Sequence, residues 1–261
     1  MALNAHLHLT AAKQLGKTYL QTSYCTPPFK IANITENTRQ PFLELMVMSS
    51  SPGILDGDVY DWQIRVAEGA CLHLQTQSYQ RIFQMDASAT QRSNIYLAND
   101  AQLVYLPHPV VPHSNSNFSA TTNIYLLDNS VLLWGEIITC GRMLHNEVFQ
   151  LTKYHSRLNI FFHEQLQIQE NVCIQPNWAM PMSLGLLEGF THQASIIYWN
   201  PQCNRSSLTQ VLHSFLGSQQ HCFGITQTNG FGLLIRLMGY KAEPLYALQK
   251  QLQHIIFQHQ N

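Results

Sequence analysis

The fold is decided by the stretch Ile64-Arg65-Val66-Ala67-Glu68-Gly69-Ala70-Cys71-Leu72-His73-Leu74. The same pattern returns at 95–105 and at 124–134. Each copy has an apolar-x-apolar arm, a short turn and a second apolar-x-apolar arm. Alternation with a period of two is typical of a strand that buries one face. The nearly constant spacing of about thirty residues indicates supersecondary units that stack on one another.

The turns within the three copies, at 67–70, 98–101 and 127–130, contain Gly, Asn or Asp, which suit the backbone angles of tight turns. One hairpin of this size cannot bury its apolar face alone, whereas stacked copies share a continuous core. Three unrelated hairpins in a β-sandwich are the alternative, and the regular spacing favours stacking. We therefore predict a mainly β fold with stacked, solenoid-like strand layers.

The composition is that of a folded chain with few charges. Of 261 residues, 45% are apolar, enough for a large core, and we expect a single domain over 1–261. Only 11% are charged, against about 25% in an average soluble protein. The resulting polar, uncharged surface suits large protein contacts, and a lineage bias toward glutamine explains it equally well. A net charge of −1 without a basic run disfavours nucleic-acid binding.

Signals for export or membrane insertion are not expected from this sequence. Residues 1–10 lack the basic and long apolar regions of a signal peptide, and no apolar run reaches membrane-spanning length. The six cysteines are scattered and form no Cys-x-x-Cys pair, which argues against a zinc site or a thioredoxin-type motif. We therefore expect a reducing, cytoplasmic location.

Further strands and stiff loops are predicted outside the repeats. The alternating segments that we interpret as strands are 7–20, 41–48, 75–83 and, as two arms with a turn at 164–165, 146–169. The prolines in 26–30 and 106–113 predict connecting loops, because proline cannot donate a hydrogen bond to a sheet ladder.

The C-terminal third changes character and predicts two helices. A capping box at 207–210 indicates one helix start, and Gly217 is a suitable stop. Asn229-Gly230 predicts a hairpin turn. A second helix is expected to begin near Pro244, and its apolar face, which we expect to pack on the sheet, consists of Leu245, Leu248, Leu252 and Ile255.

Motifs of common enzymes are missing, so no catalytic residue is proposed. The chain has neither a Gly-x-x-x-x-Gly-Lys-Ser/Thr loop nor a Gly-x-Ser-x-Gly elbow. Among its 13 histidines, His6 and His8 would share one face of a strand, and His108 and His113 flank a proline-rich segment. Imidazole suits nickel or zinc, but no pair supplies three or four ligands, and ordinary half-buried histidines are the simpler interpretation.

Three charged residues, Glu136, Arg142 and Glu147, lie within an otherwise apolar stretch. Charges on such a strand are seldom buried unless they are paired or line a water-filled cavity. An ion pair between Arg142 and one glutamate is one interpretation, and a functional polar passage or partner contact is the other.

Seven segments of the chain resemble the urease accessory protein UreD family, called UreH in some bacteria. They follow the family's order and extend over almost the whole chain. The segments are 26–30 (TPPFK), 51–53 with Gly57-Asp58, 77–82, 107–112, 136–142 with 146–149, 189–192 and 239–245.

The resemblance implies a mostly β, non-enzymatic urease maturation factor with two helices. It also implies binding to UreF, through UreF to the GTPase UreG, docking on the urease apoprotein, and a dimer of the accessory complex. We place part of the UreF contact on the helix expected near Pro244 and its preceding hairpin. A metal-dependent hydrolase and a scaffold for another metallocentre assembly system are the alternatives.

Nickel handling is the further implication, with an internal polar passage and no tightly bound cofactor. A transit route needs groups that attract a divalent cation yet release it, which isolated carboxylates do. The candidate transit or interface residues are Asp58, Glu136, Arg142 and Glu147, with His108 and His113 as weaker metal candidates.

Overall fold

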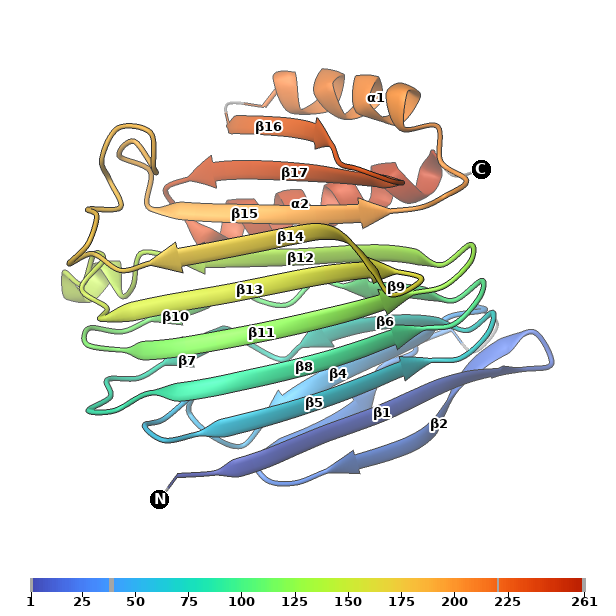
Figure 1. The fold of residues 1–261 in the computed structure, drawn as a ribbon, viewed down its shortest axis with the longest axis horizontal. Coiled ribbons are helices and arrows are strands. Elements are labelled where there is room, and N and C mark those ends of the chain that lie inside the picture. Colours follow the sequence, from blue (N-terminus) through green and yellow to red (C-terminus); the bar gives the residue numbers. More distant parts are fainter. Residues whose placement is uncertain (1, 38–39, 220, 260–261) are drawn as a thin grey trace.

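Two β-sheets lie one over the other in the computed structural model, which describes residues 2–37, 40–219 and 221–259 (Figure 1). Sheet A has the described strands, in spatial order, β14 (Gln165–Ile174), β13 (Lys153–Phe162), β11 (Asn117–Leu126), β8 (Ala89–Leu97), β5 (Val59–Val66), β1 (Asn4–Gln14) and β2 (Lys17–Cys25). Sheet B has β16 (Cys222–Gln227), β17 (Gly232–Gly239), β15 (His192–Trp199), β12 (Val131–Thr139), β9 (Gln102–Tyr105), β6 (Cys71–Thr76), β4 (Leu43–Ser49) and β3 (Phe29–Asn33), with β7 (Gln80–Ile82) and β10 (Val110–Pro112) beside them.

The three repeats stack on one another, as their spacing predicted, and the structure shows that their strands run parallel. The first arms, β5, β8 and β11, are neighbours in sheet A, with Ile64 beside Ile95 and Ile95 beside Ile124. The second arms, β6, β9 and β12, are neighbours in sheet B and align their leucines in the same way. The two arms of one copy therefore lie in different sheets, and interpreting the copies as hairpins is wrong. Alternation with a period of two shows only that every second side chain is buried. The two arms of a hairpin and two strands joined at a corner between sheets both have this pattern.

Each turn between the arms is a corner that carries the chain from sheet A to sheet B. The fourth residue of each corner donates a backbone hydrogen bond to the first, at 3.0 to 3.2 Å. The third residue has a left-handed backbone, with φ of 63° at Gly69, 58° at Asp100 and 56° at Asn129. Gly, Asp and Asn adopt this conformation more readily than other residues, as the turn sequences predicted.

Two rows of apolar side chains fill the space between the sheets. Residues in the same register on neighbouring strands form each row, and all are at most 3% exposed. The row of sheet A is Leu9, Ile64, Ile95, Ile124 and Ile160. The row of sheet B is Leu43, Leu72, Leu103 and Leu132.

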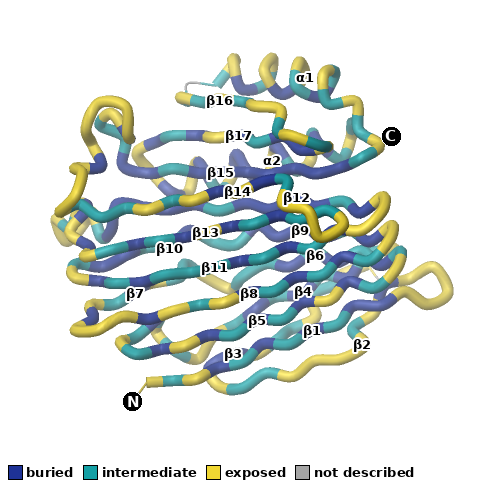
Figure 2. Tube along the Cα trace, viewed as in Figure 1, coloured by how far each residue is buried: buried dark blue, intermediate teal, exposed yellow. Residues whose placement is uncertain are grey.

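Both predicted helices are present, and they cover the outer face of sheet B near its last strands (Figure 2). Helix α1 (Arg205–Gly217) and helix α2 (Ala242–Gln258) share a second apolar cluster with β12, β15 and β17. Leu245, Leu248 and Leu252 pack there as predicted, and Ile256 rather than Ile255 completes the face. Within the described residues, no helix is long and apolar enough to cross a membrane.

The start of α1 differs from the predicted capping box. The Asn204 side chain accepts a hydrogen bond from the Ser207 backbone N–H at 3.1 Å, so Asn204 caps the helix and Ser207 lies inside it. Asparagine is as good an N-cap as serine, and the earlier cap adds three helical residues. The hairpin turn predicted at Asn229-Gly230 does join β16 to β17.

Several predicted strand limits are wrong. The segment 7–20 is split between β1 and β2, which turn at Leu15 and Gly16, both with positive φ. The segment 75–83 is divided between the end of β6 and the short β7. The first predicted arm of 146–169 begins only at Lys153.

The proline-rich segments also contain short strands where loops were predicted. Phe29 already begins β3, and Val110–Pro112 form β10, which runs parallel to β7. Val110 and Val111 retain their N–H groups, and Pro112 lies at the strand end, where a missing donor is tolerated.

Candidate functional site

Asp58, immediately before β5, connects two backbone segments and a tyrosine hydroxyl. The residue is fully buried. Its Oδ1 accepts a hydrogen bond from the Leu3 N–H at 3.0 Å, and its Oδ2 accepts from the Leu55 N–H and the Tyr60 hydroxyl, both at 2.9 Å. Both carboxylate oxygens are therefore occupied by donors of the fold itself.

Glu147 forms the ion pair that the sequence suggested for Arg142. The short helix η1 (Met143–His145) follows Arg142 and brings the chain back so that Arg142 Nε donates to Glu147 Oε2 at 2.8 Å, while Nη2 donates to Oε1. The Ser114 N–H adds a hydrogen bond at 3.2 Å. The guanidinium lowers the pKa of the Glu147 carboxyl below its usual value.

Glu136 lies half-buried in β12 and points between the sheets. Its Oε1 accepts from Trp134 Nε1 at 3.0 Å, and its Oε2 accepts from the Ser156 hydroxyl of β13 at 3.3 Å. Burial raises the pKa of this carboxyl. Glu136 also lines a cavity of about 10 Å³ with Tyr154, room for one water molecule at most.

A second ion pair, between the exposed Arg236 and the buried Glu170, lies nearby and was not predicted from the sequence. Arg236 of β17 donates through Nη2 to Glu170 of β14, at 2.9 Å to Oε2. Ser195 lies between Glu136 and Arg236 in the register of sheet B. The negative charge of Glu170 adds to the elevation of the Glu136 pKa. Thus Glu136 and Glu170 belong to one buried polar layer, whereas Asp58 and Glu147 have separate sets of partners.

His108 and His113 have separate surroundings. His108 Nδ1 lies 3.2 Å from the Thr76 hydroxyl, and the ring packs against Tyr246. His113 packs against Phe83. Burial lowers the pKa of both imidazoles. Neither joins a group of three potential metal ligands in the described part of the chain.

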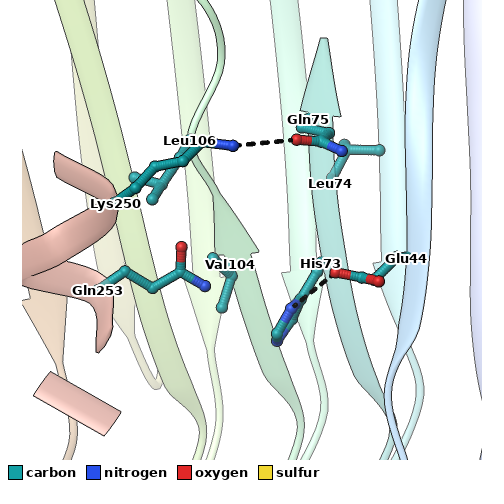
Figure 3. Close-up of a pocket in the computed structure, with 8 residues that line it drawn as sticks. All are labelled: Glu44, His73, Leu74, Gln75, Val104, Leu106, Lys250 and Gln253. Atoms are coloured by element: carbon teal, nitrogen blue, oxygen red, sulfur yellow. Dashed lines mark hydrogen bonds and ion pairs between the residues drawn. The ribbon is translucent and has the colours of Figure 1, made fainter. Parts of the chain in front are cut away.

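A pocket of about 90 Å³ lies between sheet B and α2 (Figure 3). His73 points into it, 3.9 Å from a Glu44 carboxylate oxygen, and Lys250 faces Gln75 across its opening. Burial lowers the pKa of His73 to about 4, so the imidazole is neutral at physiological pH. Sites for small-molecule substrates are usually about 300–1,000 Å³, so the pocket is too small for one.

A larger groove of about 750 Å³ opens at one end of the two sheets. We call it the end groove. Five of the segments that carry the family resemblance contribute to its lining, namely 77–82, 107–112, 136–142, 189–192 and 239–245. Tyr79 donates a hydrogen bond to Glu243, joining two of these segments.

The apolar loop, residues 175–191 between β14 and β15, exposes large side chains beside this groove. Trp178 is 81% exposed and Leu184 is 91% exposed, and Met180 and Leu186 are exposed as well. The rings of Phe190 and Tyr240 lie 5.0 Å apart and connect the loop to the end groove, which Tyr240 lines. The C-terminal end of the apolar loop therefore adjoins the end groove.

We expect the contributions of Glu136 and Glu147 to the free energy of unfolding to change in opposite directions as the pH rises. The raised pKa of Glu136 means that stability is lost as pH rises from the usual glutamate value through the folded value. The lowered pKa of Glu147 means that its contribution is present above the usual value and is lost as pH falls through the folded value. Glu136→Gln should therefore raise the free energy of unfolding at neutral pH, and Glu147→Gln should lower it.

Urea unfolding of both variants and the unmodified protein across the acid-to-neutral range measures this difference. The same direction of change for both variants at neutral pH would contradict the assignment of the two environments.

Comparison with known proteins places the chain in a family. The family model described as UreD urease accessory protein matches residues 3–260. A protein named urease accessory protein UreD from Flavobacterium johnsoniae is 39% identical over 249 residues, which cover 95% of this chain and 90% of the relative. Its namesake from Acetivibrio thermocellus is 32% identical over 254 residues and covers 97% of both chains. These relatives are named as accessory proteins and not as hydrolases. The chain belongs to the UreD urease accessory protein family.

Proposed function

We propose that this chain is a urease maturation factor that acts as a scaffold. It binds UreF, and through UreF the GTPase UreG, docks on apo-urease and assists the incorporation of nickel. The observation that carries the proposal is the family match, which spans residues 3–260 and so leaves no large part of the chain outside the accessory-protein family.

The apolar loop supports a function in protein association. Trp178 and Leu184 are largely exposed, and Met180, Met182 and Leu186 of the same loop are exposed as well. Soluble proteins rarely keep large apolar patches in water unless a partner covers them. Tryptophan is also enriched among the residues that dominate binding energy at protein interfaces. The loop therefore has the properties of a docking surface for UreF.

The end groove extends this surface with polar groups. Leu144 of η1 is fully exposed at its edge, and Arg142, Lys241 and Glu243 provide charges beside it. Figure 1 shows the connection between β14 and β15 at the same end of the sheets as η1, the short coil that follows β12. An apolar centre with a polar rim is the common arrangement of protein interfaces. By contrast, the apolar face of α2 is already buried against sheet B, so we move the proposed UreF contact from that helix to the apolar loop.

We expect Leu184→Asp to weaken UreF binding. Placing a charge at a central apolar contact costs about 2 kcal/mol or more, which corresponds to roughly a 30-fold loss of affinity. Leu15→Asp is the matched control, because Leu15 is 97% exposed but lies at the β1–β2 turn. Co-purification and titration of the full-length proteins with UreF measure the effect.

Equal binding of UreF by both variants would show that the apolar loop is not the contact. Failure of the unmodified protein to bind UreF, and to restore urease activity in cells that lack their own UreD protein, would overturn the proposed function itself.

Glu136 is the carboxylate that we propose a passing nickel ion contacts. Asp58 is occupied by backbone and tyrosine donors, and Glu147 is paired with Arg142. In the described part of the chain, Glu136 accepts from a neutral indole and a neutral hydroxyl and lies beside a small cavity. Of the three carboxylates, it is the one that a passing cation could engage without breaking an ion pair or releasing backbone groups.

Glu136→Gln should therefore lower urease activation in cells while UreF binding and the folded state are kept. Glu164→Gln, the same change at the exposed β13–β14 turn, is the control. Urease activity and nickel content are measured in the same cells, with UreF co-purification alongside. Full activation by Glu136→Gln would remove Glu136 from the nickel route and leave the scaffold function in place.

A further inference from the structure

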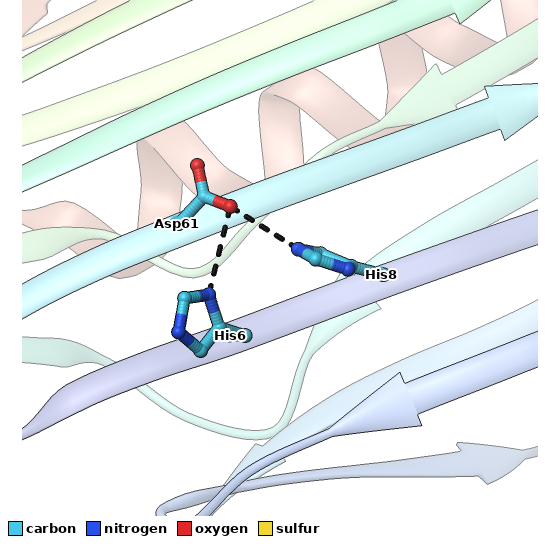
Figure 4. A group of neighbouring side chains, drawn as sticks. All are labelled: His6, His8 and Asp61. Carbon is cyan, nitrogen blue, oxygen red and sulfur yellow. Dashed lines mark hydrogen bonds and ion pairs between the residues drawn. The ribbon is translucent and has the colours of Figure 1, made fainter.

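We propose that His6, His8 and Asp61 form a binding site for one divalent transition-metal ion on the outer face of sheet A. The two histidines lie two residues apart on β1, and Asp61 lies on the neighbouring strand β5 (Figure 4). Parallel pairing places His6 directly beside Asp61. The site is separate from the apolar loop and its test does not depend on urease.

The three side chains converge on one point. Asp61 Oδ2 lies 3.1 Å from His8 Nε2 and 3.6 Å from His6 Nδ1. One ligand atom from each residue lies within 4.8 Å of the other two. Ligands bound at about 2.1 Å from a common zinc-like ion are separated by roughly 3.0–3.4 Å. The two shorter distances are therefore already close to those of a filled coordination shell.

His6 Nδ1 supplies an independent reason to expect a ligand. This atom is buried and has no hydrogen-bond partner among the described residues, although it faces Asp61 Oδ2. Buried polar atoms are normally satisfied, and each exception calls for an explanation. A cation between the two histidines and the aspartate would satisfy the His6 nitrogen and both of its neighbours at once.

The backbone around the site is fixed before any ion binds. β1 is paired on both sides, by β2 and by β5, and the Thr26 hydroxyl accepts a hydrogen bond from the His6 N–H at 2.8 Å. The Tyr24 ring packs against the His8 ring and limits its rotation. Because strands hold two of the ligands at adjacent register positions, binding requires only side-chain adjustment.

The donor set selects the class of ion. Two imidazoles and one carboxylate suit zinc, nickel, cobalt, copper or iron in the divalent state, whereas calcium and magnesium prefer oxygen ligands alone. Three protein ligands leave coordination positions open to water, so the ion would be exchangeable. The metal–ligand bonds would replace the present contact between His8 Nε2 and Asp61 Oδ2, because imidazole binds a metal through an unprotonated nitrogen.

One neighbouring positive charge repels a bound cation, so its removal should change the metal affinity in a known direction. Arg92 of β8 lies beside Asp61 in the register of sheet A and is exposed. Its positive charge repels a bound cation, weakly because water screens it. Removing this charge should therefore tighten binding, while removing a ligand should weaken it.

The test is titration of the full-length protein, without a polyhistidine tag, with Ni²⁺ or Zn²⁺ alone, followed by calorimetry and by the rise in Tm. We expect one strong equivalent, at least about tenfold weaker binding in His8→Ala and Asp61→Asn, and slightly tighter binding in Arg92→Gln. His163→Ala is the matched control, because His163 pairs with Asp128 at 2.8 Å without a third ligand in the described structure.

Circular dichroism and Tm without metal verify that each variant is folded. Unchanged affinity in both His8→Ala and Asp61→Asn, or an equal loss in His163→Ala, would overturn the site. Absence of any metal binding by the unmodified protein would overturn it as well.

Discussion

The fold depends on the contact between two rows of aliphatic side chains that face each other across the interior. Each row grows by one residue when the chain completes another turn through both sheets. A single copy of the repeat buries little apolar surface, but stacked copies remove both rows from water, and burial of apolar surface is the main stabilising term in folding. The parallel register is a consequence, because a shift by one residue would turn the apolar side chains to the outside.

This arrangement leaves specific places for polar chemistry. The rows through the repeats are apolar, whereas the carboxylates of Glu136 and Glu170 lie near the last strands, where Glu170 pairs with the exposed Arg236. The outer face of sheet B is covered there by α1 and α2, so the exposed apolar groups are concentrated in the connections at the end of the sheets. The polar layer and the candidate docking surface thus both lie where the stack of repeats ends.

Local patterns in the sequence were sufficient for some features and insufficient for others. The repeat spacing predicted the stacking, and Gly69, Asp100 and Asn129 predicted the tight corners. The partition of each copy between two sheets could not be predicted, because alternation describes burial and not which strand is the neighbour. Short strands such as β10 form because a partner strand lies alongside, which local propensity does not report.

The same limit applies to the sites. His6 and His8 were predicted to share a face, but Asp61 joins them only through parallel pairing of strands more than fifty residues apart in sequence. The Glu170–Arg236 pair likewise joins strands of different sheets. By contrast, Arg142 and Glu147 are five residues apart in sequence, and an ion pair between Arg142 and a nearby glutamate was predicted from the sequence.

The parallel register of the repeats can be measured directly by engineered disulfides on the outer face of sheet A. Asn94 and Asn123 occupy the same register position, and their side chains are hydrogen-bonded at 3.1 Å. Neighbouring strands lie about 4.8 Å apart, which a disulfide spans, whereas a shift by two residues gives roughly 8 Å, beyond its reach of about 7 Å. In a protein whose six free cysteines are replaced by serine or alanine, the pair Asn94→Cys with Asn123→Cys should cross-link on mild oxidation, and Asn94→Cys with Thr121→Cys should not. Cross-linking of the second pair in preference to the first, determined by peptide mass spectrometry, would contradict the in-register stack.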